Sequence, residues 1–515
     1  MPKIAKRQKA AREKVDRTQK LTLDEAVQSA LEQNLTLQVQ RIDPRVQDYA
    51  VAQARSGYLP TVSSFVNYQN ADIVNNQTFQ GGTALSTTAG NGQAGFSQFL
   101  PTGGSLSAAW NLGRSTSNAP SNAFNPATSG SLNLQFSQPL LRNFSIDGTR
   151  QALLISKVNR EMSDITLRAT VVNTVHNVKV AYWNLVGARS NLDVAQQSLA
   201  LSRQTLKDNQ TRVEVGTMAP IDIVQAQAEV ANNEEQVIVA QAQVQQFEDV
   251  LRTLIYDPQS PDFWTQHLEP SEAPTLTTAQ IDVDAAIKSA LDKRTDLRNA
   301  AKSMQESQIN IRYTKNQLLP AVNGQVGYTT NALGGVQGDR IIRYGSVLGD
   351  VFSAAYPTWS VGVSVSYPIG QNNAQAGLAR AQLQYHESEL QLRQLQMSVA
   401  QQVRDVVRRV NTNLKRIDAT RAARELSERK LEAEQKKFAV GLSTSFQVVQ
   451  AQRDLATARY NEVQAILDYT TSLADFEAVQ ETSVGTVGQS SGQIVIAQPS
   501  SNGSGATGST TSGGR

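Results

Sequence analysis

The sequence predicts an α+β membrane protein that is built from two internal structural repeats. Three observations predict this class. Residues 21–68 match residues 281–328 without a gap. Segments of period-2 alternation follow the matched regions, and apolar repeats of seven residues follow those segments. The chain is therefore expected to combine amphipathic helices, membrane-type strands and long coiled-coil helices, each of them twice.

The repeat sets the predicted domain organisation. Leu21–Leu31 lies over Ile281–Leu291, and Val215-Gly216 lies over Val440-Gly441. Insertions separate the matched blocks. The predicted domains are a first repeat at 21–255, a linker at 256–280 and a second repeat at 281–482.

Each repeat is expected to open with an amphipathic helix. The first copy shows apolar residues at helical spacing, with Asp24 and Glu25 suited to the positive end of the helix dipole. The apolar positions are Leu23, Ala26, Val27, Ala30 and Leu31. The helices should stop near Leu59-Pro60 and Leu319-Pro320, because a residue before proline avoids helical angles.

Strand-like alternation follows each Leu-Pro pair. It is cleanest over 359–367, where Trp359 and Tyr367 stand at the two ends of an apolar face opposite small polar residues. Similar alternation occurs at 61–68, 131–137 and 321–328. Segments of about nine residues suit outer-membrane barrel strands. A soluble sandwich with one wet face is the alternative.

The remaining insertions leave one question open. The stretch 104–112 also alternates and is a candidate extra strand in the first repeat. The segments 70–103, 113–129 and 329–357 are rich in Gly, Asn, Ser and Thr, and we expect loops there.

Very long helices are predicted after Pro139 and Pro368. Apolar residues recur every seven positions in both repeats, which indicates left-handed supercoiling. Residues 147–213 alone would form a helix of about 100 Å at about 1.5 Å per residue, too long for a globular domain. The two Val-Gly pairs are expected to cap these helices and permit a reversal.

Composition excludes several function classes. The chain has 515 residues, no cysteine, and 48 Lys+Arg against 45 Asp+Glu, which gives a formal charge of +3. Residues 1–20 carry eight of the basic residues and two acids, so the rest is mildly acidic and has no electrostatic case for nucleic acid. His176, His267 and His386 lack metal-ligand spacing. No nucleophile–base pair or phosphate loop is visible, so we expect no catalytic residue, metal or cofactor, and hence no enzyme.

The two ends differ in composition from the repeats. A basic arm at 1–20 and a Ser/Gly-rich tail at 483–515 are predicted to be disordered. The chain has no run of 18 apolar residues, so no transmembrane helix is predicted. The basic start lacks the apolar stretch of an export signal. The strand pattern favours a native start elsewhere over a cytoplasmic protein.

The order of the elements resembles the outer membrane factor family, the TolC-like channels of Gram-negative export systems. The resemblance covers residues 21–482. Its marks are Leu59-Pro60, Leu319-Pro320, Gln138-Pro139-Leu140-Leu141, Tyr367-Pro368-Ile369 and the paired Val-Gly tips. It implies a homotrimer in which each protomer gives about four strands to a shared 12-stranded transmembrane β-barrel. A long α-helical coiled-coil periplasmic tunnel would continue the barrel, with 256–280 in an equatorial belt.

The resemblance also implies a function. The chain would be a passive outer-membrane exit channel of a tripartite efflux or type I secretion system. Its partners would be a periplasmic adaptor (membrane fusion protein), an inner-membrane transporter and outer-membrane lipid. Relaxation of the coiled helices at the periplasmic tip would open it. A soluble structural coiled-coil protein without transport activity is the alternative.

Family members suggest three sets of site residues. The adaptor-docking tips would be Val215, Gly216, Thr217, Val440, Gly441, Leu442 and Ser443. The periplasmic constriction would be lined by Asp222, Gln225, Phe446, Gln447 and Gln450. The membrane girdle would contain Tyr68, Tyr328, Trp359 and Tyr367. Because glutamines replace the usual carboxylates, a cation-sensitive gate is not expected, and amide hydrogen bonds with packing of Phe446 would hold the closed state.

Overall fold

The computed structural model describes residues 18–74, 84–259, 263–274, 281–370 and 373–481. These residues divide into two compact units. The tip unit takes the described residues within 1–34, 171–286 and 403–515, and the sheet unit takes those within 35–170 and 287–402. The long helices α4 (Gly148–Glu214) and α9 (Asn373–Ala439) contribute to both units.

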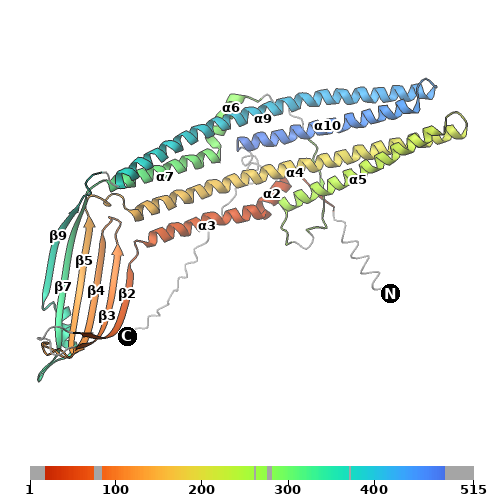
Figure 1. The fold of residues 1–515 in the computed structure, drawn as a ribbon. Helices are drawn as coiled ribbons and strands as arrows, with labels where there is room; N and C mark the ends of the chain where they lie inside the picture. Colours follow the sequence, from red (N-terminus) through yellow and green to blue (C-terminus); the bar gives the residue numbers. More distant parts are fainter. Residues whose placement is uncertain (1–17, 75–83, 260–262, 275–280, 371–372, 482–515) are drawn as a thin grey trace, which may run out of the picture. The chain divides into compact units, whose positions relative to one another are not determined.

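The sheet unit contains six long antiparallel strands in the spatial order β2-β3-β4-β5-β7-β9 (Figure 1). The strands are β2 (Thr61–Val74), β3 (Ala84–Phe99), β4 (Ser105–Ser117), β5 (Ala127–Pro139), β7 (Ala321–Gln337) and β9 (Pro357–Ser366). The short β8 (Arg340–Ile342) also pairs with β7. Helices α3 (Leu35–Ser56) and α7 (Thr295–Gln317) each lead into a strand after a Leu-Pro pair, as predicted.

The register gives the sheet one apolar and one polar face. Residues directly opposite each other in a sheet share a face, so rows of paired residues define the two sides. One row across all six strands is Val62, Phe96, Ala108, Leu134, Tyr328 and Trp359. The row beside it is Thr61, Ser97, Ser107, Gln135, Gly327 and Ser360. Alternation carries this division along β5, β7 and β9. It is weaker in β2 and β3, where Phe65, Ile73 and Leu85 lie on the polar face.

Helix α8 (Tyr344–Phe352) packs on part of the apolar face. Val347 and Val351 are buried against a cluster that includes Trp110 and Leu132. The glycine at position 130 permits this approach, because a Cβ there would lie 2.9 Å from a Val351 methyl carbon.

Several expectations about the strands were wrong. The first repeat supplies four long strands to the sheet and the second supplies two, whereas about four strands per protomer were expected for a barrel. The expected extra strand at 104–112 is present, because residues 105–112 belong to β4. The segments 70–103 and 113–129 contain strand residues rather than loops alone. The segment 329–357 contains the end of β7, β8 and α8. Strand β3 is rich in Gly, Ser and Thr, so its apolar pattern is weak and its residues have little strand propensity of their own. Pairing with the neighbouring strands holds it in the sheet.

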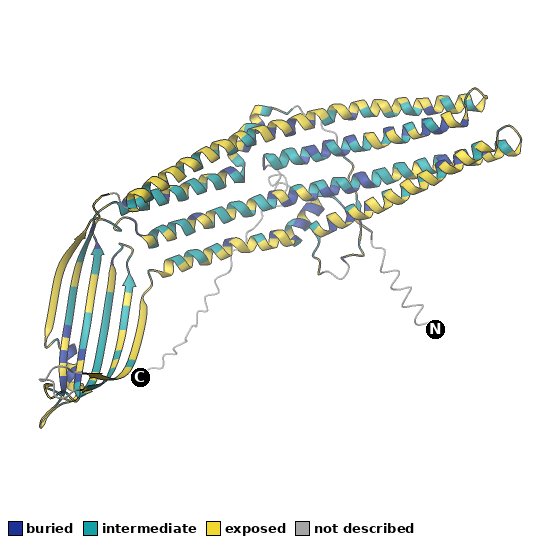
Figure 2. Cartoon of the chain, viewed as in Figure 1, coloured by how far each residue is buried: buried dark blue, intermediate teal, exposed yellow. Residues whose placement is uncertain are grey.

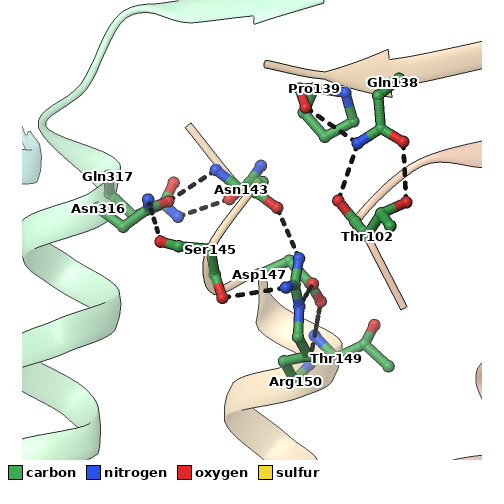
Figure 3. Close-up of polar contacts among 10 residues, drawn as sticks. All are labelled: Thr102, Gln138, Pro139, Asn143, Ser145, Asp147, Thr149, Arg150, Asn316 and Gln317. Atoms are coloured by element: carbon green, nitrogen blue, oxygen red, sulfur yellow. Dashed lines mark hydrogen bonds and ion pairs between the residues drawn. The ribbon is translucent and has the colours of Figure 1, made fainter. Parts of the chain in front are cut away.

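Polar side chains join the strand-to-helix junctions of the sheet unit (Figure 3). Asn316 Oδ1 accepts from the backbone N–H of Asn143 at 2.6 Å, and Asn316 Nδ2 donates to Ser145 Oγ at 3.1 Å. Asp147 accepts from the backbone N–H groups of Thr149 and Arg150 at the start of α4. These bonds satisfy backbone groups where the chain turns from sheet to helix.

The tip unit contains helices α2 (Leu23–Gln33), α5 (Ile221–Ile255) and α10 (Ser445–Val479) beside its parts of α4 and α9. Helix α6 (Val283–Lys293) spans the boundary between the units. Figure 2 shows buried residues on α2, α4 and α10. The central cluster packs Val27 of α2 on Val178 and Leu185 of α4. Corresponding long helices have equal lengths, with 67 residues in α4 and α9 and 35 in α5 and α10.

A small parallel sheet changes two predicted boundaries. Strand β1 (Thr18–Leu21) pairs with β6 (His267–Pro270). The predicted boundary of the disordered arm at residue 20 is therefore wrong, because residues 18–20 belong to β1 and are held by hydrogen bonds to β6. The linker 256–280 contains β6. Residues 1–17 and the tail 483–515 lie outside the described residues. In the part of the chain that the structure describes, no helix is long and apolar enough to cross a bilayer.

Candidate functional site

Both long helices end in the same backbone turn, at the two predicted Val-Gly tips. Gly216 has φ +77° and Gly441 has φ +80°, conformations that suit glycine because it has no Cβ. Thr217 N–H donates to the Arg212 carbonyl at 2.8 Å, and Leu442 N–H donates to the Lys437 carbonyl at the same distance. This is the Schellman pattern, in which the turn satisfies the last carbonyls of the helix.

The tips present apolar side chains to solvent. Val215 is 69% exposed, Val440 is 70% exposed and Leu442 is 79% exposed. Exposed apolar groups beside rigid turns are suited to contact with a partner. The polar tip residues instead bond within the chain, where Thr217 Oγ1 donates to the Arg212 carbonyl and Ser443 Oγ donates to Glu434 Oε2 at 2.7 Å.

The predicted constriction residues begin the return helices. Asp222 and Gln225 lie in the first turns of α5, while Phe446, Gln447 and Gln450 begin α10. Thr444 caps α10 by accepting from Gln447 N–H. Phe446 is 55% exposed, so its ring is not packed within one chain.

Gln450 hydrogen-bonds to the ion pair of Lys430 and Asp454. Gln450 Nε2 donates to Asp454 Oδ1 at 2.9 Å, and Lys430 Nζ of α9 lies 2.6 Å from Asp454 Oδ2. The hydrogen bonds from Lys430 and from Gln450 lower the pKa of Asp454. The carboxylate of Asp454 therefore stays ionised at neutral pH. It places a negative charge beside Gln450, although positions 447 and 450 themselves carry neutral amides.

Sequence reasoning missed the bonds that join the two helical hairpins. Asn209 Nδ2 of α4 donates to Ser445 Oγ of α10 at 3.0 Å, and both residues are buried. Gln452 Nε2 donates to Thr205 Oγ1 at 2.8 Å. The available signal was a polar residue inside the heptad pattern, since Asn209 lies three positions after the repeat position Leu206.

A buried carboxylate adds an ion pair between α5 and α10. Glu229 is 6% exposed, and its Oε2 lies 2.9 Å from Arg453 Nε and 2.5 Å from Arg453 Nη2. Nearby, the guanidinium of Arg212 lies 4.5 Å from the centre of the Phe438 ring. The pair and the cation–π contact join α4, α5, α9 and α10 close to the tips.

A cavity of about 790 Å³ lies between α4, α5 and α10. Its lining is rich in amides and includes Asn184, Asn191, Asn233, Gln236 and Tyr460. Such a lining can exchange hydrogen bonds with a polar surface. Within the described ranges no three His, Cys, Asp or Glu side chains gather as a metal site.

The predicted girdle residues all belong to the sheet unit. Trp359 is 74% exposed and pairs with Tyr328, and both lie on the apolar face. Tyr68 shares this face and is 76% exposed. Tyr367 directly follows β9, eight residues after Trp359, which is about 26 Å along a strand at about 3.3 Å per residue. With the strand tilt of about 40° found in membrane barrels, this length spans about 20 Å of the membrane normal, somewhat less than an apolar band of about 25 Å.

A family model described as outer membrane efflux protein matches residues 26–255 and 286–479. The chain belongs to this family. Outer membrane efflux proteins are channels of the outer membrane and are not known as enzymes. The assignment confirms the resemblance that the repeated elements suggested, and it favours an efflux channel over a soluble structural coiled coil.

Solved structures share the fold of this outer membrane efflux protein at low sequence identity. CusC is 14% identical with a TM-score of 0.66, over 89% of this chain and 91% of CusC. A membrane protein from Pseudomonas aeruginosa is 15% identical with a TM-score of 0.65, over 89% and 93% of the two chains. The Campylobacter jejuni CmeC outer membrane channel is 15% identical with a TM-score of 0.64, over 89% and 85%. No curated protein matches the chain.

Proposed function

We propose that three copies of the chain form an outer-membrane exit channel, with one barrel closed from three sheet units. The observation that carries this proposal is the division of the sheet into an apolar and a polar face across six strands. A membrane barrel needs apolar residues towards lipid and polar residues towards its lumen. In the described sheet, β2 and β9 are the outer strands, and pairing β9 of one copy with β2 of the next would remove both open edges.

The coiled helices would form a periplasmic tunnel that continues the barrel. The channel would serve a tripartite efflux or type I secretion system as a passive conduit, together with an inner-membrane transporter and a periplasmic adaptor. The exposed Val215, Val440 and Leu442 would be adaptor contacts. Two rigid turns of the same geometry in each chain would give a trimer six similar docking points.

The tunnel would open by relaxation of the helices at the tip. Asp222, Gln225, Gln447 and Gln450 begin the return helices and would surround the constriction together with Phe446. The bonds between hairpins at Asn209–Ser445 and Glu229–Arg453 would hold the closed arrangement. Separation of the hairpins would break these bonds together, which would make opening cooperative.

The test is reconstitution of the purified full chain. A functional channel should run on gels as a heat-modifiable trimer and should give discrete conductance steps in planar bilayers. A soluble monomer without conductance would contradict the proposal. To test docking, Val440→Asp with Leu442→Asp should abolish co-purification of an adaptor and leave the trimer intact. Leu426→Asp is a matched control, because Leu426 is also exposed but lies on α9 away from the turn.

A further inference from the structure

We propose that the β3–β4 hairpin is part of the barrel wall, so that the outlet in the membrane is wide. Such an outlet would pass bulky solutes. The inference rests on the proposed trimer, in which three copies of six long strands give eighteen. Because barrel diameter grows roughly linearly with strand number, the outlet would be about 1.5 times as wide as one with four strands per copy.

The hairpin is continuous with its neighbours. All fourteen residues of β2 pair with β3, from Thr61 with Ser97 to Val74 with Ala84. Strand β4 pairs with β5 from Ser105 with Ser137 to Ser115 with Ala127. Strands β2 and β5 have no direct pairing in the described sheet, since β3 and β4 lie between them. Removal of the hairpin from the wall would therefore open the sheet in its middle.

The hairpin also follows the division of faces. Phe96, Leu106, Trp110 and Leu112 share the apolar face with the outward residues of β2 and β5. Asn91, Gln93 and Asn111 share the polar face. If the hairpin lay outside the membrane, an apolar face aligned with the outward faces of β2 and β5 would be exposed to water, which is unfavourable.

The polar face is hollowed where the hairpin crosses it. A cavity of about 850 Å³ is lined by residues of five long strands, among them Phe65, Asn91, Asn111 and Asn331 of the polar face, and by Arg340 of β8. The sheet is thus concave on the side of its amides and hydroxyls. This curvature is the one that a lumen wall requires.

The polar face of the six long strands has no charged residue. The paired segments contain two charges, Asp72 and Arg114, and both lie on the opposite face by their pairing with Ser86 and Gly90. Arg340 of the short β8 lines the same cavity and pairs with Gln337 of the polar face. The long strands would therefore give a neutral lumen wall, with a positive charge at β8 in each copy.

Two adjacent alanines in β4 provide a matched test. Ala108 lies on the apolar face and Ala109 on the polar face, and the chain has no cysteine that would interfere. In reconstituted channels, Ala109→Cys should react with a water-soluble maleimide at least about tenfold faster than Ala108→Cys, because lipid excludes the charged reagent. A fluorophore at residue 108 should be quenched by a lipid-borne quencher. Equal reactivity would overturn the inference.

Width is tested with maleimides on polymers of increasing size. Ser364→Cys, on the polar face of β9, is labelled in the full chain and in a variant that lacks residues 84–117. The largest polymer that reacts should be smaller in the shortened variant, and an unchanged limit would overturn the inference. Bilayer conductance of the unlabelled full chain is measured in parallel. Conductance with equal reactivity at 108 and 109 would refute the hairpin's role alone, whereas no conductance would refute the proposed channel.

Discussion

Asn209 of α4 and Ser445 of α10 form a buried hydrogen bond of 3.0 Å between the two helical hairpins. Ser445→Ala would leave the Asn209 amide without this acceptor in a site that excludes water. We expect a loss of about 1–3 kcal/mol in the free energy of unfolding. The measurement is the melting temperature of the solubilised protein, with Ser198→Ala as control because Ser198 Oγ bonds to the Val194 carbonyl of its own helix. Equal melting temperatures would show that the bond contributes nothing.

Glu229 and Arg453 form an ion pair between α5 and α10, in which the Glu229 side chain is buried and the Arg453 side chain is 52% exposed. Glu229→Gln removes one charge from a site that is 6% exposed, and we expect a loss of about 1.5–3 kcal/mol. Channel conductance should rise, since the return helices are less firmly joined. Glu234→Gln is the control, because the Arg203–Glu234 pair is exposed and should contribute about 1 kcal/mol or less. Similar effects of both variants would contradict a special role for the buried pair.

The glycines of the tips should not tolerate a side chain. Gly216→Ala and Gly441→Ala meet no atom within 4 Å, so the expected loss of about 1–2 kcal/mol each comes from the left-handed backbone alone. Gly441→Asn should lose less, because asparagine adopts this conformation more readily. Gly377→Ala, inside α9, should stabilise by about 0.5–1 kcal/mol. Chemical unfolding measures all four, and a stable Gly441→Ala protein would refute the argument.

Charge at the predicted constriction should create a cation-sensitive gate. Gln447→Asp with Gln450→Asp would place up to six carboxylates around the axis of a trimer, and divalent cations should then lower the conductance. Gln447→Asn with Gln450→Asn controls for the shorter side chains without added charge. If divalent cations have the same effect on both double variants in planar bilayers, these residues do not line the constriction.

Acid should weaken the joint between α4 and α10. His176 Nε2 lies 2.8 Å from Asp475 Oδ1, and this hydrogen bond lowers the pKa of Asp475 against the effect of burial. A lowered carboxyl pKa gives stability that is present above the unfolded value of about 3.9 and is lost as pH falls through the folded pKa. The stability difference between the native chain and Asp475→Asn should therefore shrink as pH is lowered below about 4. Asp405→Asn, at an exposed i,i+3 pair, is the control, and a difference independent of pH would contradict the assignment.

Local chemistry made much of the fold predictable from the sequence. Two kinds of residue predict the C-terminal ends of the long helices to within a few residues. The prolines at 60 and 320 mark the ends of α3 and α7, and the glycines at 216 and 441 mark the ends of α4 and α9. Each signal acts between near neighbours in the chain. The alternation of β9 was equally clear, because its apolar residues are valines and aromatics that favour strands.

Long-range pairing limited what the sequence could predict. Strand β3 has 16 residues with few apolar side chains, and its ladder with β2 and β4 forms through backbone groups that have no sequence signature. Strand β1 likewise depends on β6, almost 250 residues away. The bonds Asn209–Ser445 and Glu229–Arg453 join residues more than 220 positions apart.

The sequence by itself therefore determined the repeated helices, their turns and the family of the chain, since these depend on local backbone preferences and on apolar periodicity. The tertiary structure decided how many strands the sheet contains, which residues share its polar face and which side chains join the hairpins. Those features depend on contacts between distant segments, and only a folded chain brings such segments together.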